Sequence, residues 1–262
     1  MIASPIQVAY ANLLAVLLVQ FPLMLLLPIA SGFFARKRLG ARLMLFWIGG
    51  ATFVASQLVH LPLNWALGLI GAPRGVALLP LPVVGAVAGL SAGLCEEVAR
   101  YGTMRWVVKS DRGWPSAVQL GLGHGGVEAM IFGLLALSSF VNILLAPYAA
   151  SLGVSDADQA ILRHAARTYW ETPWYHPVLA GWERVCAITF HTGASVLVMR
   201  AVVRRNLGYL ALAVLLHALL DAPLVYSREL GLFWLYVFIT SAALGMGLVV
   251  VRLRGPSEQR SE

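Results

Sequence analysis

The run VALLPLPVVGAVAGLSAGLCEEVARYGTMRWV (residues 76–107) decides the fold class of this chain. It is long and apolar enough to cross a bilayer, which takes about 20 helical residues, yet Glu96, Glu97 and Arg100 lie inside it. A charge at the bilayer centre costs about 2.5–3.5 kcal/mol even on lenient insertion scales. Such residues are therefore expected to face the interior of a helix bundle and to mark a functional site.

The remainder of the chain has the same apolar character. Of its 262 residues, 59% are hydrophobic and only 12% are charged, whereas about a quarter of the residues of a soluble protein are charged. The sequence predicts an all-α, multi-pass bundle that forms a single membrane domain over residues 1–262, with a core at about 76–226. Seven spans are expected, at about residues 8–34, 43–71, 76–107, 116–148, 178–202, 208–226 and 231–252.

The basic residues predict how the bundle is oriented. They gather after the first, third, fifth and seventh spans, and the positive-inside rule assigns such loops to the cytoplasm. The N-terminus is then outside the cell membrane and the C-terminus is cytoplasmic. This pattern also accounts for the net charge of +7 without a nucleic-acid partner. The residues concerned are Arg36, Lys37, Arg38, Arg42, Arg105, Lys109, Arg112, Arg200, Arg204, Arg205, Arg252 and Arg254.

One long loop, at about residues 149–177, is expected on the outer side. Ser155 followed by Asp156 is typical of a helix N-terminus, and Tyr169, Trp170 and Trp174 favour the membrane–water boundary. We interpret the loop as an interfacial helix, and a lid over a substrate site is the alternative. The tail at about 255–262 is predicted to be disordered.

The strongest local signal is the carboxylate pair Glu96 and Glu97. On a helix Arg100 is three and four residues away, so it can reach either one. Two adjacent carboxylates in a low dielectric cannot both ionise without compensation, and a carboxylate of this kind suits general acid–base chemistry. The alternative is an ion pair that only holds helices together.

Three later spans carry histidines. In the fourth, His124 is followed by Glu128 on the same helix face, and Gly121 and Gly125 form a small-xxx-small pattern that lets helices approach closely. In the sixth, Asp221 follows His217 by one turn and can orient its ring. Packing contacts alone are the alternative for both pairs.

The fifth span carries Glu183, Arg184 and His191. The first two can be a structural ion pair near the outer face, and His191 is either a core histidine or a site residue.

Depth connects these residues. At ~1.5 Å per residue, Glu97 lies ~18 Å from Lys109, while His124, His191 and His217 lie ~12–13 Å inside the cytoplasmic ends of their spans. Side chains at one depth on four helices favour one composite site, and we expect it to open toward the cytoplasm.

This ordered set resembles the CAAX-protease and bacteriocin-processing (CPBP) superfamily of intramembrane proteases. The matching features are Glu-Glu-x-x-Arg on one span, a mid-span His on the next and His-x-x-x-Asp on a later one, over about residues 80–226. The Gly-His-Gly-Gly-x-Glu stretch and the Glu-Arg…His span are similar to its YhfC branch of membrane peptidases.

The resemblance implies a four-helix core and peptide-bond hydrolysis by a water that a glutamate and a histidine activate. Glu96 would be the base and His124 its partner, with Glu97 and Arg100 in support, although which glutamate is the base stays open. The oxyanion would be stabilised by the pair His217 and Asp221. Further supporting residues are expected to be Glu128, His191, Glu183 and Arg184.

Three alternatives remain from the sequence. The first is a zinc-dependent protease, with His124, His191 and His217 as ligands; otherwise no cofactor is expected. The second is a proton-coupled transporter and the third is a non-catalytic scaffold. The expected partners are the lipid bilayer and a peptide within or beside the membrane, and the oligomeric state is left open.

The topology can be tested by cysteine accessibility. Single cysteines in the 36–42 loop and in the 149–177 loop should react with a membrane-impermeant thiol reagent from opposite sides of the membrane, because an odd number of spans separates them. Labelling of both from the same side would contradict the seven-span arrangement.

Overall fold

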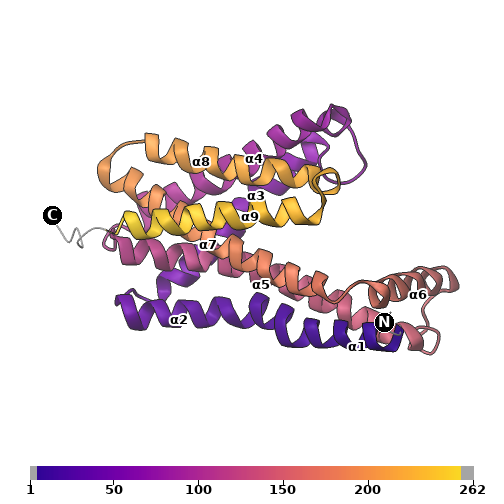
Figure 1. Cartoon of the computed structure of the whole chain (residues 1–262). Helices are drawn as coiled ribbons and strands as arrows, with labels where there is room; N and C mark the ends of the chain where they lie inside the picture. Colours follow the sequence, from indigo (N-terminus) through magenta and orange to yellow (C-terminus); the bar gives the residue numbers. More distant parts are fainter. Residues whose placement is uncertain (1–4, 255–262) are drawn as a thin grey trace. The chain divides into compact units, whose positions relative to one another are not determined.

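The computed structural model describes residues 5–254, without the side chains of residues 5, 227 and 228 (Figure 1). The predicted disorder at 255–262 lies outside the described residues. Within them the chain is all helical and contains no strand, which confirms the predicted class. The elements are α1 Pro5–Ala15, η1 Val16–Gln20, η2 Pro22–Leu26, α2 Leu27–Leu39, α3 Met44–Leu67, η3 Gly75–Leu78, α4 Leu81–Gly102, η4 Thr103–Val107, α5 Trp114–Leu145, η5 Ala146–Tyr148, α6 Asp156–Glu171, α7 Tyr175–Arg204, α8 Gly208–Asp221, η6 Ala222–Tyr226 and α9 Ser227–Arg252.

Seven helical segments of the described chain are long and apolar enough to cross a membrane, so the predicted number of spans is confirmed. The second span ends earlier than expected, because Gly68 adopts a left-handed conformation (φ 79°) and its N–H caps the helix. The seven segments are Ile6–Leu39, Met44–Leu67, Leu81–Val107, Trp114–Tyr148, Tyr175–Arg204, Gly208–Tyr226 and Glu229–Arg252.

The chain forms two compact units. Among the described residues, the first comprises 5–27 and 129–185, and the second comprises 28–128 and 186–254. The single membrane domain expected from the sequence stays a prediction.

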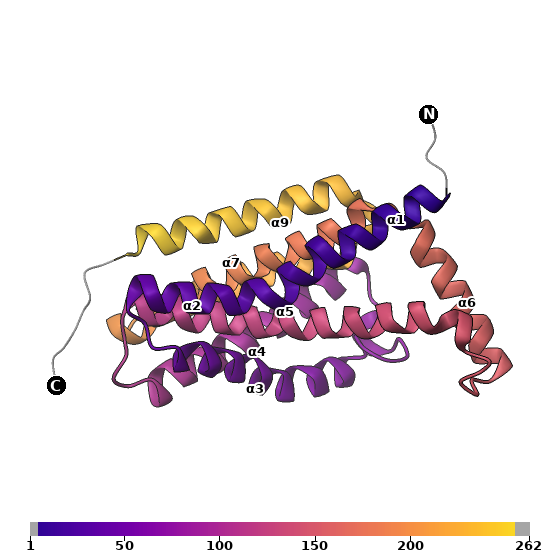
Figure 2. The same ribbon diagram turned by 90° about the horizontal axis from the view of Figure 1, so that it is seen from below.

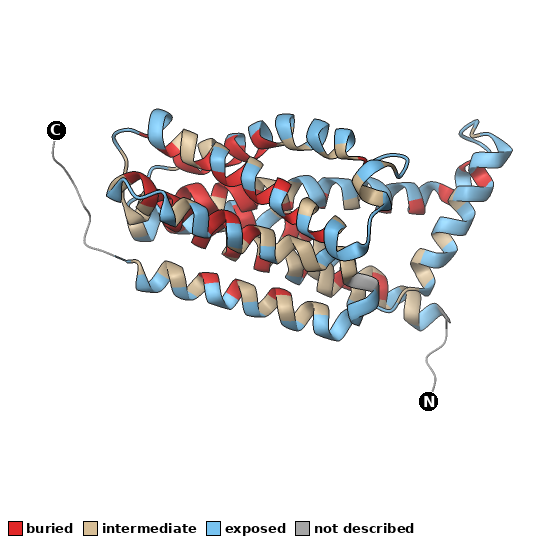
Figure 3. Ribbon diagram, turned by 90° about the horizontal axis from the view of Figure 1, so that it is seen from above, coloured by how far each residue is buried: buried red, intermediate tan, exposed pale blue. Residues whose placement is uncertain are grey.

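The first unit contains the helix expected in the long loop. The Ser155 hydroxyl accepts a hydrogen bond from the Asp158 N–H at 3.2 Å, which confirms the predicted start of α6. The buried Asn12 of α1 donates to the carbonyls of Tyr169 and Thr172, both at 2.9 Å, and burial raises the pKa of the Tyr169 hydroxyl to about 12. Most of α6 is exposed (Figure 3), and its place at a membrane interface stays a prediction.

In the second unit α4 packs along α8 (Figure 1), and α3 lies along α4 as well (Figure 2). Gly85, Gly89 and Gly93 lie four residues apart on the face of α4 that meets α8 and the following η6. A Cβ atom added at Gly89 would lie 2.3 Å from the carbonyl oxygen of Ala218. Only glycine permits this approach of two helix backbones.

Glycines also set the position of α5. A Cβ at Gly121 would lie 2.5 Å from Thr192 Cα on α7, which confirms the close approach predicted for this helix, and a Cβ at Gly123 would lie 1.8 Å from Phe46 O on α3. The backbones of α3, α4, α5, α7 and α8 therefore approach closely in pairs, and polar side chains beside these contacts can meet.

The α4–α8 contact can be tested by adding one methyl group. Gly89→Ala should lower the free energy of unfolding in detergent by about 1–3 kcal/mol, because the new Cβ overlaps the Ala218 carbonyl. The matched control is Gly245→Ala on α9, where an added Cβ has no neighbour within 4 Å in the described structure. Equal thermal stability of the two variants would contradict the proposed packing.

Candidate active site

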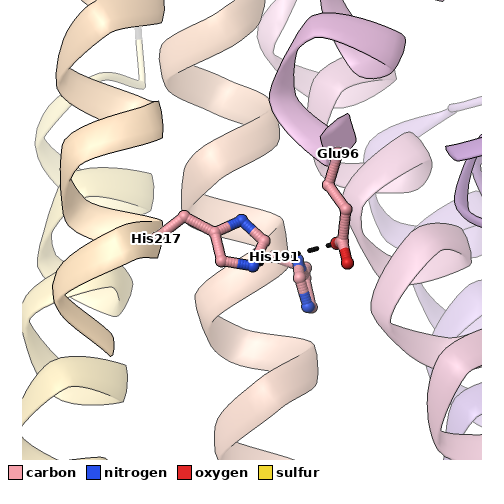
Figure 4. A group of neighbouring side chains, drawn as sticks. All are labelled: Glu96, His191 and His217. Atoms are coloured by element: carbon pink, nitrogen blue, oxygen red, sulfur yellow. Dashed lines mark ion pairs between the residues drawn. The ribbon is translucent and has the colours of Figure 1, made fainter. Parts of the chain in front are cut away.

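Four polar side chains from four helices of the second unit converge at one buried point. Glu96 comes from α4, His124 from α5, His191 from α7 and His217 from α8, and Figure 4 shows three of them pointing toward one another. All four are buried. The helices that the sequence placed at a common depth thus bring these side chains together.

One oxygen of Glu96 is the common point of the cluster. Its Oε2 lies 3.0 Å from His124 Nε2 and 3.9 Å from His217 Nε2. The His191 ring completes the group, with its centroid 4.8 Å from that of His124 and 5.3 Å from that of His217. The cluster therefore contains a carboxylate oxygen and three imidazoles within contact of each other.

Glu97 orients the ring of His217. It is fully buried, forms an ion pair with Arg100, and its Oε1 accepts a hydrogen bond from His217 Nδ1 at 2.8 Å. Since Nδ1 donates to Glu97, Nε2 is directed toward Glu96 and toward Asp221, whose Oδ2 lies 3.5 Å away. A ring nitrogen that lies between two carboxylates is a position where a positive charge is stabilised, and that charge can be a proton or a metal ion.

Arg100 has a second partner, His191. A guanidinium only donates hydrogen bonds, so His191 Nδ1, 3.1 Å from Arg100 Nη2, must accept. The proton of the neutral ring is then on Nε2, which lies 2.7 Å from Glu128 Oε2. Arg100 thereby fixes the tautomer of His191, and the carboxylate of Glu128 lies beside the protonated ring nitrogen.

The structure thus brings together eight of the ten residues singled out in the sequence. The other two, Glu183 and Arg184, belong to the first unit. They form an ion pair there, and the Arg184 guanidinium lies 4.7 Å from the centre of the Phe132 ring. The opening of the cluster toward the cytoplasm stays a prediction.

A polar face on α3 was not expected from the sequence. Gln57 donates to Glu96 Oε1 at 3.1 Å, and His60 and Asn64 continue the network away from the cluster. Their spacing of three and four residues inside an apolar span places them on one helix face, and that pattern is the signal that could have revealed them.

Three residues of the cluster could hold a metal ion. Glu96, His191 and His217 each offer a ligand atom, and these atoms lie within 4.8 Å of one another. Two imidazoles and one carboxylate are a ligand set that catalytic zinc sites use, leaving a position open for water. The zinc-dependent alternative drawn from the sequence predicted His124, His191 and His217 as the ligands. In the structure Glu96, not His124, joins His191 and His217 in this group.

The surroundings of these ligands fit a metal. His217 already presents Nε2 toward Glu96, with Nδ1 held by Glu97 in the manner of a carboxylate–histidine–metal contact. His191 has partners on both ring nitrogens, so metal binding at its Nε2 would replace the contact with Glu128.

The fold and the cluster define a multi-pass membrane protein with a buried glutamate–histidine centre. Over residues 23–239 the chain matches the family described as YhfC intramembrane metalloprotease, and it belongs to that family. It is 33% identical over 212 residues to the uncharacterized membrane protein YhfC of Bacillus subtilis (strain 168). This match covers 78% of the present chain and 81% of that protein. No solved structure matches it. The resemblance to the YhfC branch drawn from the sequence motifs is thereby confirmed.

The buried ion pair between Glu97 and Arg100 predicts a large effect on stability. Glu97→Gln should lower the free energy of unfolding by about 3–5 kcal/mol, because it leaves the Arg100 charge buried without its counter-ion. The matched control is Asp111→Asn, which breaks the exposed pair with Arg42 at 2.8 Å and should cost at most about 1 kcal/mol. Similar denaturation midpoints for the two variants in detergent would contradict the assigned role of the pair.

Proposed function

We propose that the chain is a zinc-dependent intramembrane protease whose metal is held by Glu96, His191 and His217. The observation that carries the proposal is that these three buried side chains come from three separate helices and bring one ligand atom each to within 4.8 Å of the others. The family's description supports the same function. The sequence motifs alone favoured a metal-independent mechanism over a zinc-dependent one, and these two findings support the zinc-dependent form.

Zinc, when bound, would act as a Lewis acid on the scissile carbonyl and on a water molecule. The remaining chemistry falls to the protein. Glu97 holds His217 with its Nε2 lone pair available, and Arg100 forms a hydrogen bond with His191 while neutralising Glu97. These contacts fix the donor atoms before a metal arrives, which lowers the cost of organising the site.

We assign His124 the role of proton acceptor for the attacking water. Its Nε2 lies 3.0 Å from Glu96 Oε2, and a neutral imidazole that donates to a carboxylate keeps a lone pair on Nδ1. This Nδ1 has no hydrogen-bond partner among the described residues. In this scheme Asp221 borders the cluster at a more exposed position, next to His217.

The substrate class follows from where the site lies. The ligands belong to helices that are long enough to span a membrane, so the peptide bond to be cut must be within or beside the bilayer. The orientation predicted by the basic loops places the cluster somewhat to the cytoplasmic side of the midplane. We therefore propose a membrane-embedded or membrane-adjacent peptide as substrate.

The zinc content of purified variants distinguishes the residues that bind the metal from the residue that accepts the proton. The purified wild-type chain should carry zinc, and Glu96→Gln or His217→Ala should lose most of it because each removes a ligand. His124→Ala should keep the metal and lose cleavage of a labelled single-span peptide reconstituted with the protein. Loss of zinc from His124→Ala would instead make His124 a ligand.

Chelation tests the metal requirement directly. Removal of zinc should abolish cleavage of the same peptide, and zinc should restore it, while Glu96→Gln stays inactive under both conditions. Full activity of a chain proven free of metal would support the metal-independent mechanism instead. Proton flux in vesicles without cleavage would favour a transporter.

A further inference from the structure

The polar face of α3 has no role in the proposed mechanism. Gln57, His60 and Asn64 lie one turn apart on this helix, while Leu58 and Val59 between them are mostly exposed. Amide and imidazole groups inside a span avoid lipid and seek partners within the bundle. The three side chains accordingly meet α4, where Ser91 completes their network.

The hydrogen bonds of this network run in one direction. Asn64 Nδ2 can only donate, so His60 Nε2, which lies 3.0 Å away, accepts. The single proton of the Ser91 hydroxyl has two acceptors within reach, Asn64 Oδ1 at 3.0 Å and the Ala88 carbonyl at 2.8 Å. Because His60 Nε2 accepts, its Nδ1 carries the proton, and this proton points to Gln57 Oε1 at 3.3 Å.

The last step reaches Glu96. With its oxygen engaged by His60, Gln57 must present its amide NH₂ to the neighbouring carboxylate, and its Nε2 lies 3.1 Å from Glu96 Oε1. The two oxygens of Glu96 are therefore distinguished. Oε1 receives the Gln57 donor, and Oε2 faces His124 and His217.

We propose that Gln57, with its amide orientation set by His60 and Asn64, is a positioning residue that holds Glu96 with a single oxygen toward the metal. The inference rests on the proposed function, since it concerns the same carboxylate. Without the Gln57 donor, Glu96 can rotate or offer both oxygens, and the ligand geometry is no longer fixed. The competing explanation is that these side chains only tie α3 to α4.

Cobalt binding distinguishes the two explanations. Gln57→Met keeps the approximate size of the side chain but removes the donor, and it should weaken Co²⁺ binding to the full-length purified chain about 10- to 100-fold. It should also change the visible absorption of the bound Co²⁺, because Glu96 is no longer restricted to one oxygen. The matched control is Gln119→Met, which removes another buried amide whose bond ends on the Gly32 carbonyl, and it should leave both readouts unchanged.

A second variant acts from a distance. His60→Leu leaves Gln57 in place but removes the group that orients its amide, so it should shift the Co²⁺ spectrum in the same direction. Unchanged affinity and spectrum in both Gln57→Met and His60→Leu, with normal Co²⁺ binding by the wild type, would overturn this inference alone and leave a structural tie. A wild-type chain that binds no Co²⁺ would overturn the proposed function and this inference together.

Discussion

Two adjacent carboxylates buried in an apolar helix impose the constraint on which this structure depends. Neither Glu96 nor Glu97 can be left in a low dielectric without partners, because an uncompensated buried charge costs several kcal/mol. Glu97 is compensated by Arg100 and His217, and Glu96 by Gln57, His124 and His217. Arg100 lies on α4 itself, whereas Gln57, His124 and His217 come from α3, α5 and α8, so the pair dictates which helices surround α4.

The close approach of the helices makes such compensation geometrically feasible. Hydrogen bonds of about 3 Å between side chains on separate helices require backbones that nearly touch, and glycines on α4 and α5 allow this. Gly93 lies against Val214 and His217 of α8, and Gly125 lies against Ile188 and His191 of α7. The glycines that allow the helices to pack closely and the residues that form the site are therefore neighbours on the same helices.

Most of the framework could be predicted from the sequence, because apolar runs of about 20 residues are a strong signal for membrane-spanning helices. The convergence of Glu96, His124, His191 and His217 was expected from depth alone. Depth could not reveal which atoms meet, since the rotation of each helix about its axis is set by packing. For that reason the exchange of Glu96 for His124 in the metal-binding group appears only in the structure.

The α3 network was missed for another reason. Glutamine, histidine and asparagine carry no full charge, so Gln57, His60 and Asn64 do not stand out in an apolar span as the glutamates do. Their meaning depends on the contact with Ser91 and Glu96 of α4, which no spacing within α3 specifies. Conversely, Glu183 and Arg184 were conspicuous in the sequence, yet their ion pair belongs to the other unit.

The most direct test of the central claim is X-ray absorption at the zinc edge of the purified, full-length protein. The account predicts a spectrum with two imidazole ligands and oxygen donors, which becomes altered or absent in Glu96→Gln. A zinc centre with thiolate ligands, which would have to involve Cys95 or Cys186, would contradict the account. So would a chain that binds no zinc.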